Sequence, residues 1–193
     1  MEQKIETSTF KVSLDGIAEI QFDRFEKQEA DTRPPDQKLY LAEGDVIVLP
    51  SENIWAFLFG EGKPAGCAKS FEGKGSAQYL RMGQSHLILS PPLIPFTRNG
   101  KPIVFKEFDR KSLYVSQFAP RTKSGSLSIK NNVRLRPVLM LPWALSFDIT
   151  IIKNELITDT KLLNWFKRGG IEIGLGNYRP RFGRFLVNVE SAA

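Results

Sequence analysis

Apolar and polar side chains alternate along two stretches near the start of the chain and along a longer stretch in its last third. Phe10, Val12 and Leu14 alternate with polar residues, and a second apolar-polar stretch covers residues 17–22. Successive side chains of a β-strand point to opposite faces, so this period of two is typical of half-buried strands. The same alternation over residues 143–152 predicts a third strand.

Shorter apolar runs predict further strands, which lie at residues 46–49, 86–89, 113–118, 133–140, 171–176 and 184–189. A hairpin is predicted where Asn99-Gly100 separates the apolar runs at 94–96 and 103–105. Asn-Gly favours a two-residue hairpin turn because both residues tolerate positive φ.

Two helices are predicted from helical spacing and end signals. The first covers residues 52–58, with Ser51 as its N-cap. The second begins after Thr158 or Asp159 and ends at the glycine pair 169–170, because glycine commonly terminates a helix.

The order of these elements indicates an α+β protein. A strand, a crossover helix and a returning strand in the last third form half of a split βαβ unit, and the N-terminal strands with the first helix supply the other half. Residues 60–76 hold five glycines and three lysines and are expected to form a mobile basic loop. The prediction is a single domain over residues 1–193, with a ferredoxin-like βαββαβ core at about 1–62 and 137–193 and a β-hairpin-rich insertion at about 63–136.

The composition limits the class of protein. With 41% hydrophobic and 25% charged residues, the 193-residue chain can bury one core and does not resemble a disordered chain. The longest uncharged stretch, residues 82–97, contains three prolines, so no membrane-spanning helix is expected. The N-terminus lacks a signal-peptide pattern, which favours a cytoplasmic protein. One cysteine and one histidine exclude an internal disulfide and the usual zinc ligands, so no metal or cofactor is expected.

Basic residues gather in the second half of the chain. The net charge is +6, but residues 110–193 carry fourteen basic and five acidic residues. We call residues 110–136 the basic track; its cations are Arg110, Lys111, Arg121, Lys123, Lys130, Arg134 and Arg136. Tyr114 and Phe118 interleave with them, and cations with aromatic rings are how proteins hold single-stranded nucleic acid. The alternative is a solvated basic face, or an internal match to the acidic first third of the chain.

The most specific segment is residues 169–184, which we call the Gly/Arg loop. Gly174 and Gly176 permit a sharply turned backbone that a ligand can approach closely, and the loop arginines suit bidentate phosphate contacts. The alternatives are an ordinary helix end at residues 169–170 and an exposed turn. The candidate nucleic-acid-binding residues are Lys167, Arg168, Gly174, Gly176, Tyr178, Arg179, Arg181 and Arg184, with Arg121, Lys123, Lys130, Arg134 and Arg136 of the basic track.

The Gly/Arg loop resembles the C-terminal glycine-rich loop of the RAMP superfamily, the RNA-binding backbone and processing subunits of CRISPR systems. Gly174-Leu175-Gly176 matches the first half of that motif, Phe182-Gly183 matches the end of the second half, and Arg181 stands in place of its other glycine. The resemblance covers residues 143–190. It implies an RRM-like fold, binding of single-stranded RNA, and assembly with CRISPR-type subunits or with further copies of the chain. This C-terminal segment also resembles the ends of some phage and prophage proteins.

The function expected from these patterns is binding of single-stranded nucleic acid, with RNA favoured over DNA and Tyr178 stacking on a base. One alternative is a metal-independent endoribonuclease in which His86 is the general base. A non-enzymatic protein is favoured, because no motif around His86 supplies a catalytic partner. The other alternative is a phage counter-defence protein that mimics a CRISPR subunit and binds protein partners.

Overall fold

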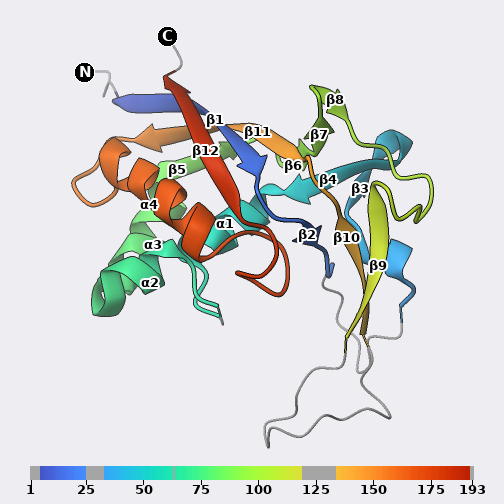
Figure 1. Ribbon diagram of the computed structural model, residues 1–193. Coiled ribbons are helices and arrows are strands. Elements are labelled where there is room, and N and C mark those ends of the chain that lie inside the picture. Colours follow the sequence, from blue (N-terminus) through green and yellow to red (C-terminus); the bar gives the residue numbers. More distant parts are fainter. Residues whose placement is uncertain (1–4, 25–32, 63, 119–133, 192–193) are drawn as a thin grey trace, which may run out of the picture.

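The computed structural model describes residues 5–24, 33–62, 64–118 and 134–191. These residues form a mixed α+β protein whose sheets are mostly antiparallel (Figure 1). The prediction of an α+β protein is therefore confirmed.

The main sheet combines strands from both ends of the chain. Its first three strands in spatial order are β12 (Phe185–Ser191), β1 (Thr7–Gly16) and β11 (Ala144–Ile152). Strand β11 also pairs with β5 (Leu87–Ser90) and with β7 (Thr97–Arg98), which forms a hairpin with β8 (Lys101–Pro102). The pairs β1–β11, β1–β12 and β5–β11 are all antiparallel. Alternate residues such as Val12 and Leu14 are buried, as the period of two predicts.

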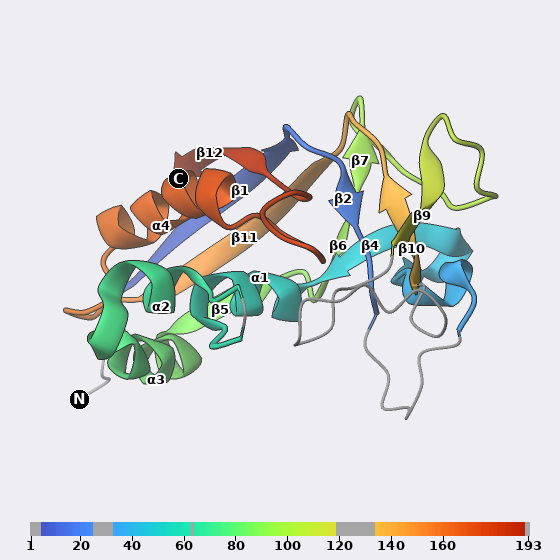
Figure 2. The ribbon, with the colours of Figure 1, turned by 60° about the horizontal axis from the view of Figure 1, so that its bottom comes forward.

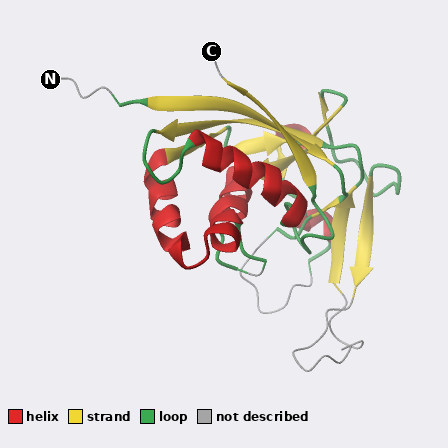
Figure 3. Cartoon of the chain, turned by 60° about the vertical axis from the view of Figure 1, so that its left-hand side comes forward, coloured by secondary structure: helices red, strands yellow, loops and turns green. Residues whose placement is uncertain are grey.

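A layer of helices covers one face of this sheet (Figures 1 and 3). The helices are α1 (Ser51–Phe59), α2 (Cys67–Glu72), α3 (Ser76–His86) and α4 (Asp159–Glu172). The ring of Phe57 lies 5.5 Å from that of Phe166 and 5.4 Å from that of Phe185, so α1, α4 and β12 share one aromatic core. Residues 67–90, which fall within the expected insertion, thus contribute α2, α3 and β5 to the main layers.

Two smaller sheets lie beside the main one. One contains β2 (Ile20–Gln21), β10 (Arg134–Leu139) and β9 (Leu113–Phe118); the other contains β3 (Leu41–Ala42), β4 (Val46–Pro50) and β6 (Leu93–Pro95). Short 3₁₀ turns occur at η1 (Pro35–Lys38), η2 (Glu43–Asp45) and η3 (Gly73–Gly75). Strands β9 and β10 form a two-stranded ribbon at the end of the molecule away from α2 and α3 (Figures 1 and 2). We call this pair the β9–β10 ribbon.

Several predicted elements are confirmed. Strands occupy the predicted positions near 10–14, 46–49, 113–118 and 143–152. The Asn99-Gly100 turn joins β7 to β8, and both residues have positive φ, 51° and 75°. Local sequence determines these elements because strand alternation and turn chemistry act over a few residues.

The interpretation of residues 60–76 as a mobile loop is wrong. Cys67 and Ala68 begin α2 and are buried, and the backbone N–H of Gly66 donates to the carbonyl of Gly60 at 2.7 Å. A Cβ at Gly66 would lie 2.7 Å from the nitrogen of Gly60, so this glycine permits close packing and not mobility. His86, expected to begin a strand, is the last residue of α3.

The predicted ends of both helices also need correction. Ser51 is the first residue of α1, and the N-cap position belongs to Pro50. Helix α4 does begin after Thr158, whose Oγ1 accepts from the Lys161 N–H, but it continues through the glycine pair to Glu172. The strand expected at 171–176 is therefore absent from the described structure, where these residues finish the helix and turn.

The two glycines inside α4 serve helix packing. A Cβ at Gly169 would lie 2.6 Å from Sγ of Cys67, and a Cβ at Gly170 would lie 2.5 Å from the carbonyl oxygen of Phe185. Only glycine lets α4 approach α2 and β12 this closely, which explains why a residue type that often ends helices continues one here.

Candidate nucleic-acid interface

The segment around β2 carries a row of polar side chains on one side. Ile20 and Phe22 are buried in the core, whereas Glu19, Gln21 and Asp23 alternate with them, and we call these three residues the polar row. Because side chains alternate along an extended segment, the three face the same way. We call the junction at which this segment meets the β9–β10 ribbon and the Gly/Arg loop the seam.

Each residue of the polar row contacts the β9–β10 ribbon. The Tyr114 hydroxyl donates to Oε2 of Glu19 at 2.7 Å, and Gln21 Nε2 donates to the Ser116 hydroxyl at 2.7 Å. One ribbon arginine, Arg136, donates through Nη2 to Oδ2 of Asp23 at 2.6 Å. Three successive polar positions thus hold the ribbon against β2.

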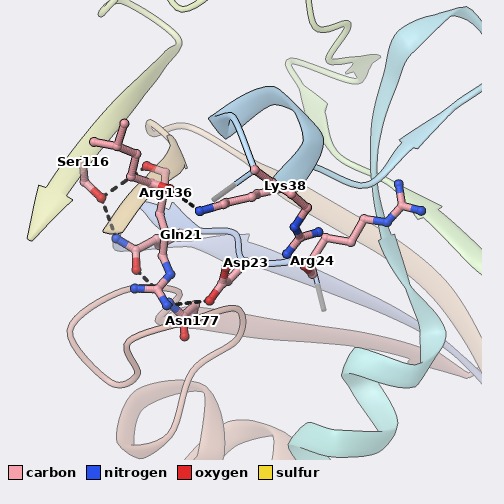
Figure 4. A network of polar contacts seen from close by, with 9 residues as sticks. Gln21, Asp23, Arg24, Lys38, Ser116, Arg136 and Asn177 are labelled. Atoms are coloured by element: carbon pink, nitrogen blue, oxygen red, sulfur yellow. Dashed lines mark hydrogen bonds and ion pairs between the residues drawn. The ribbon is translucent and has the colours of Figure 1, made fainter. Parts of the chain in front are cut away.

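The Gly/Arg loop packs along the backbone edge of this segment that faces away from β10. Asn177 donates its backbone N–H to the carbonyl of Gln21 at 2.8 Å and its Nδ2 to Oε1 of Gln21 at 3.0 Å (Figure 4). The N–H of Gly183 donates to the carbonyl of Glu19 at 2.7 Å. The structure therefore brings together the two regions that the sequence marked separately, the Gly/Arg loop and the basic track.

The glycines of the loop approach the protein's own backbone. Gly174, Gly176 and Gly183 have φ values of 75°, 74° and 74°. A Cβ at Gly176 would lie 2.6 Å from the carbonyl oxygen of Gln21, and a Cβ at Gly183 would overlap the carbonyl of Leu175. We expected Gly174 and Gly176 to allow close approach of a ligand; in the structure they allow the loop to fold on β2.

The three loop arginines have different surroundings. Arg179 is half-buried, donates to the carbonyls of Pro64 at 3.1 Å and Gly174 at 3.5 Å, and has its pKa lowered by this burial. Arg181 and Arg184 are exposed and form no ion pair within the described residues. They are the loop cations best placed to meet a phosphate.

Aromatic rings lie beside these exposed arginines. The Tyr178 side chain is 48% exposed, and its ring lies 6.3 Å from that of Phe182. The guanidinium carbon of Arg181 lies 5.9 Å from the Phe182 ring. An exposed ring next to a cation can stack on a base while the cation holds the neighbouring phosphate.

The candidates on helix α4 are exposed but differ in charge pairing. Arg168 donates to Oε1 of Glu172 at 2.6 Å and lies 4.1 Å from the Phe71 ring, while Lys167 is exposed. Neither lies in the last turn of α4, because the helix runs four residues beyond Arg168. The pairing with Glu172 makes Arg168 a weaker candidate for a phosphate than Arg181 or Arg184.

The ribbon supplies one exposed and one buried cation. Arg134 is exposed at the start of β10, whereas the Arg136 side chain is only 6% exposed and is paired with Asp23. Arg136 therefore holds the ribbon to β2 in this structure. The remaining candidates of the basic track, Arg121, Lys123 and Lys130, lie outside the described residues.

Several residues of the seam were not predicted from the sequence. Gln21, Ser116 and Asn177 were missed, as was Lys38, a buried lysine whose Nζ donates to the carbonyl of Leu135 at 2.9 Å (Figure 4). The alternation over residues 18–23 was a usable signal for the polar row. No local signal marks Asn177 or Lys38.

Tyr114 acts as a fixed hydrogen-bond donor. The pKa of Tyr114 is raised to about 12, mainly by partial burial and then by the hydrogen bond to Glu19 and its negative charge. The nearby positive charge of Arg181 opposes this rise. The hydroxyl therefore stays protonated at neutral pH, and it holds the Glu19 carboxylate in one position.

The open face of the main sheet is an unsuitable platform for nucleic acid. Lys11 lies opposite Asp148 on β11 and Glu190 on β12, so its charge is matched by neighbouring acids. Among the described residues of β1, β5, β11 and β12, the outward side chains include no aromatic ring. A strand bound on this face would find neither stacking partners nor excess positive charge.

His86 is the last residue of α3, a helix that lies away from the β9–β10 ribbon (Figures 1 and 2). Its Nδ1 is 2.7 Å from the Ser85 hydroxyl. Cys67 is buried, and this burial raises the pKa of its thiol. Cys67 lies near one loop arginine, because the positive charge of Arg179 partly opposes this rise.

Nothing else in the described residues, and no known relative, indicates what this protein binds. Across the described ranges, no three His, Cys, Asp or Glu side chains gather as a metal site. No helix in the described part of the chain has the length and apolar character needed to cross a bilayer. The sequence matches no protein-family model and no curated protein.

Proposed function

We propose that this protein binds single-stranded RNA along the surface formed by the Gly/Arg loop and the β9–β10 ribbon. The observation that supports this most directly is the position of Gln21, which hydrogen-bonds to Asn177 of the loop and to Ser116 of the ribbon. These two segments belong to the most basic part of the chain. Their contact joins the two segments into one candidate surface, and its exposed cations Arg134, Arg181 and Arg184 favour a polyanion.

The proposal assigns a role to each described loop residue. Arg181 and Arg184 contact phosphates, and Tyr178 stacks on a base, since these side chains are exposed. Arg179 and Gly176 maintain the shape of the loop through their backbone contacts. Arginine contacts to phosphates account for affinity without base preference, and the stacked ring favours a single strand over a duplex.

We further propose that the core is ferredoxin-like and related to the RAMP superfamily. The order β12-β1-β11-β5 is wholly antiparallel; helices α1 to α3 lie between β1 and β5 in the chain, and α4 lies between β11 and β12. This is the arrangement that two interlocked split βαβ units produce. In such a protein, further copies of the chain or CRISPR-type subunits are the expected neighbours along the bound strand.

The test is the salt dependence of binding to a labelled single-stranded RNA about 30 nucleotides long, a length that spans several typical binding sites. Wild type is compared with Arg181→Ala/Arg184→Ala and with the matched control Lys11→Ala/Lys101→Ala, which removes the same charge from exposed positions elsewhere. Each phosphate contact contributes about −0.7 to the log–log slope for a single strand, so the loop variant should flatten the slope by about 1.4. Duplex and single-stranded DNA serve as competitors.

Two results would contradict the proposal. Wild type that fails to bind any of these nucleic acids at low salt has no phosphate surface. Equal slopes for the loop variant and the control would place the contacts elsewhere on the protein.

A further inference from the structure

The seam contains two carboxylates: Asp23 is paired with Arg136, whereas Glu19 forms no ion pair among the described residues. The backbone carbonyl of Glu19 accepts from Gly183 of the Gly/Arg loop, and its Oε2 accepts from Tyr114 of the ribbon, both at 2.7 Å. Glu19 thus touches both segments of the proposed RNA surface. These two contacts fix its backbone and side chain, so the carboxylate is held in position before a ligand arrives.

The second carboxylate oxygen of Glu19 is still available. Oε1 has no hydrogen-bond partner among the described residues, and the residue is only half-buried. Each carboxylate oxygen can accept about two hydrogen bonds, so Oε2 also retains capacity beside the Tyr114 hydroxyl. Two preorganised acceptors therefore stand at the junction of loop and ribbon.

A carboxylate at this place is poorly suited to the RNA backbone. It repels phosphates and cannot donate a hydrogen bond, so it favours ligand groups that carry N–H donors. In a single strand these donors are on the base edges. Guanine presents an imino and an amino group side by side, which matches the two oxygens of one carboxylate, whereas adenine and cytosine present only an amino group and uracil a single imino group.

We propose that Glu19 reads guanine in the bound strand, accepting hydrogen bonds from its imino and amino groups, with Tyr114 as the residue that positions the carboxylate. The proposal rests on the proposed function, because it gives base preference to the same RNA surface. It predicts that the protein binds RNA through phosphates in general and prefers strands that place a guanine at this junction.

The experiment measures fluorescence anisotropy with labelled oligoribonucleotides about 12 nucleotides long, within the range of single-strand site sizes. The probes are oligouridine and repeats of UUG, UUA and UUI, in which inosine lacks only the amino group of guanine. Wild type should bind the UUG repeat about tenfold more tightly than oligouridine, since a good bidentate base contact discriminates by about 5- to 150-fold. The UUI repeat should lie between them.

Glu19→Gln decides the role of the carboxylate. Its amide oxygen can still accept from Tyr114, so the fold is kept, which a matching thermal melting temperature checks. The variant should lose the preference for UUG while binding oligouridine at least as well as wild type. Asp148→Asn removes an equal charge from the open face of the main sheet and should change neither affinity nor preference.

Three outcomes separate the two proposals. Equal binding of all four probes by wild type overturns guanine recognition and leaves RNA binding intact. A Glu19→Gln variant that weakens every probe by the same factor shows a merely structural role and also overturns it. Failure of wild type to bind any probe at low salt overturns both proposals together.

Discussion

The Nδ2 of Asn177 lies 3.0 Å from Oε1 of Gln21, a residue 156 positions earlier in the chain. Gln21 is buried, and its Nε2 donates at the same time to Ser116. A single amide therefore joins the C-terminal loop to the central ribbon. The surface proposed to bind RNA depends on this contact.

Replacing Gln21 with leucine should weaken this junction. The substitution keeps the volume but removes the partner that Gln21 gives to the half-buried Asn177 and Ser116, and each lost hydrogen bond costs about 0.5–1.5 kcal/mol. Urea unfolding should show this loss, and affinity for single-stranded RNA should fall as the loop loses its support. Gln117→Leu, at an exposed position of the same ribbon, is the control. An unchanged free energy of unfolding would show that the amide does not hold the two segments.

Gly183→Ala should be more destabilising than Gly100→Ala. Both glycines have φ near 75°, where an L-residue costs about 1–2 kcal/mol. A Cβ at Gly100 would have no atom within 4 Å, whereas a Cβ at Gly183 would overlap the Leu175 carbonyl. The difference between the two variants in urea midpoint therefore measures the packing of the loop. Equal losses would mean that the loop backbone can move aside.

Gly169→Ala tests whether packing or helix propensity governs the end of α4. Alanine is about 1 kcal/mol better than glycine inside a helix, so propensity alone predicts stabilisation. The new methyl group would meet Cys67 Sγ at 2.6 Å and the Phe57 ring at 2.7 Å, so we expect net destabilisation. Cys67→Ala combined with Gly169→Ala should recover part of the loss in a double-mutant cycle. A stabilised single variant would contradict the close approach of α4 and α2.

Asp109 should make stability depend on pH in the acid range. Its Oδ1 accepts from the backbone N–H groups of Ser112, Lys111 and Leu113, and these hydrogen bonds lower its pKa from 3.8 to about 2. Because the pKa is lower in the folded state, this contribution is complete above about pH 4 and is lost as the pH falls toward 2. Asp109→Asn should remove that part of the pH dependence. Urea midpoints measured from pH 6 to pH 2 test this, and parallel curves for wild type and variant would contradict it.

Part of the fold could be predicted because its signals are local. Alternating residues located β1 and β11, Asn99-Gly100 located the hairpin turn, and Thr158 located the start of α4. The glycines at residues 60–76 and 169–170 led to wrong predictions. A glycine looks the same in sequence whether it turns the chain or admits a neighbouring helix, and only the neighbour decides which.

Residue types and periods of a few residues were enough to establish the α+β class, most strands, the basic second half of the chain, and the presence of a loop rich in glycine and arginine. Three further features required the folded chain: Arg136 pairs with Asp23, Arg181 and Arg184 stay exposed, and Gln21 joins the loop to the ribbon. The alternation of a strand states which residues share a face, but the partners of that face come from distant parts of the chain.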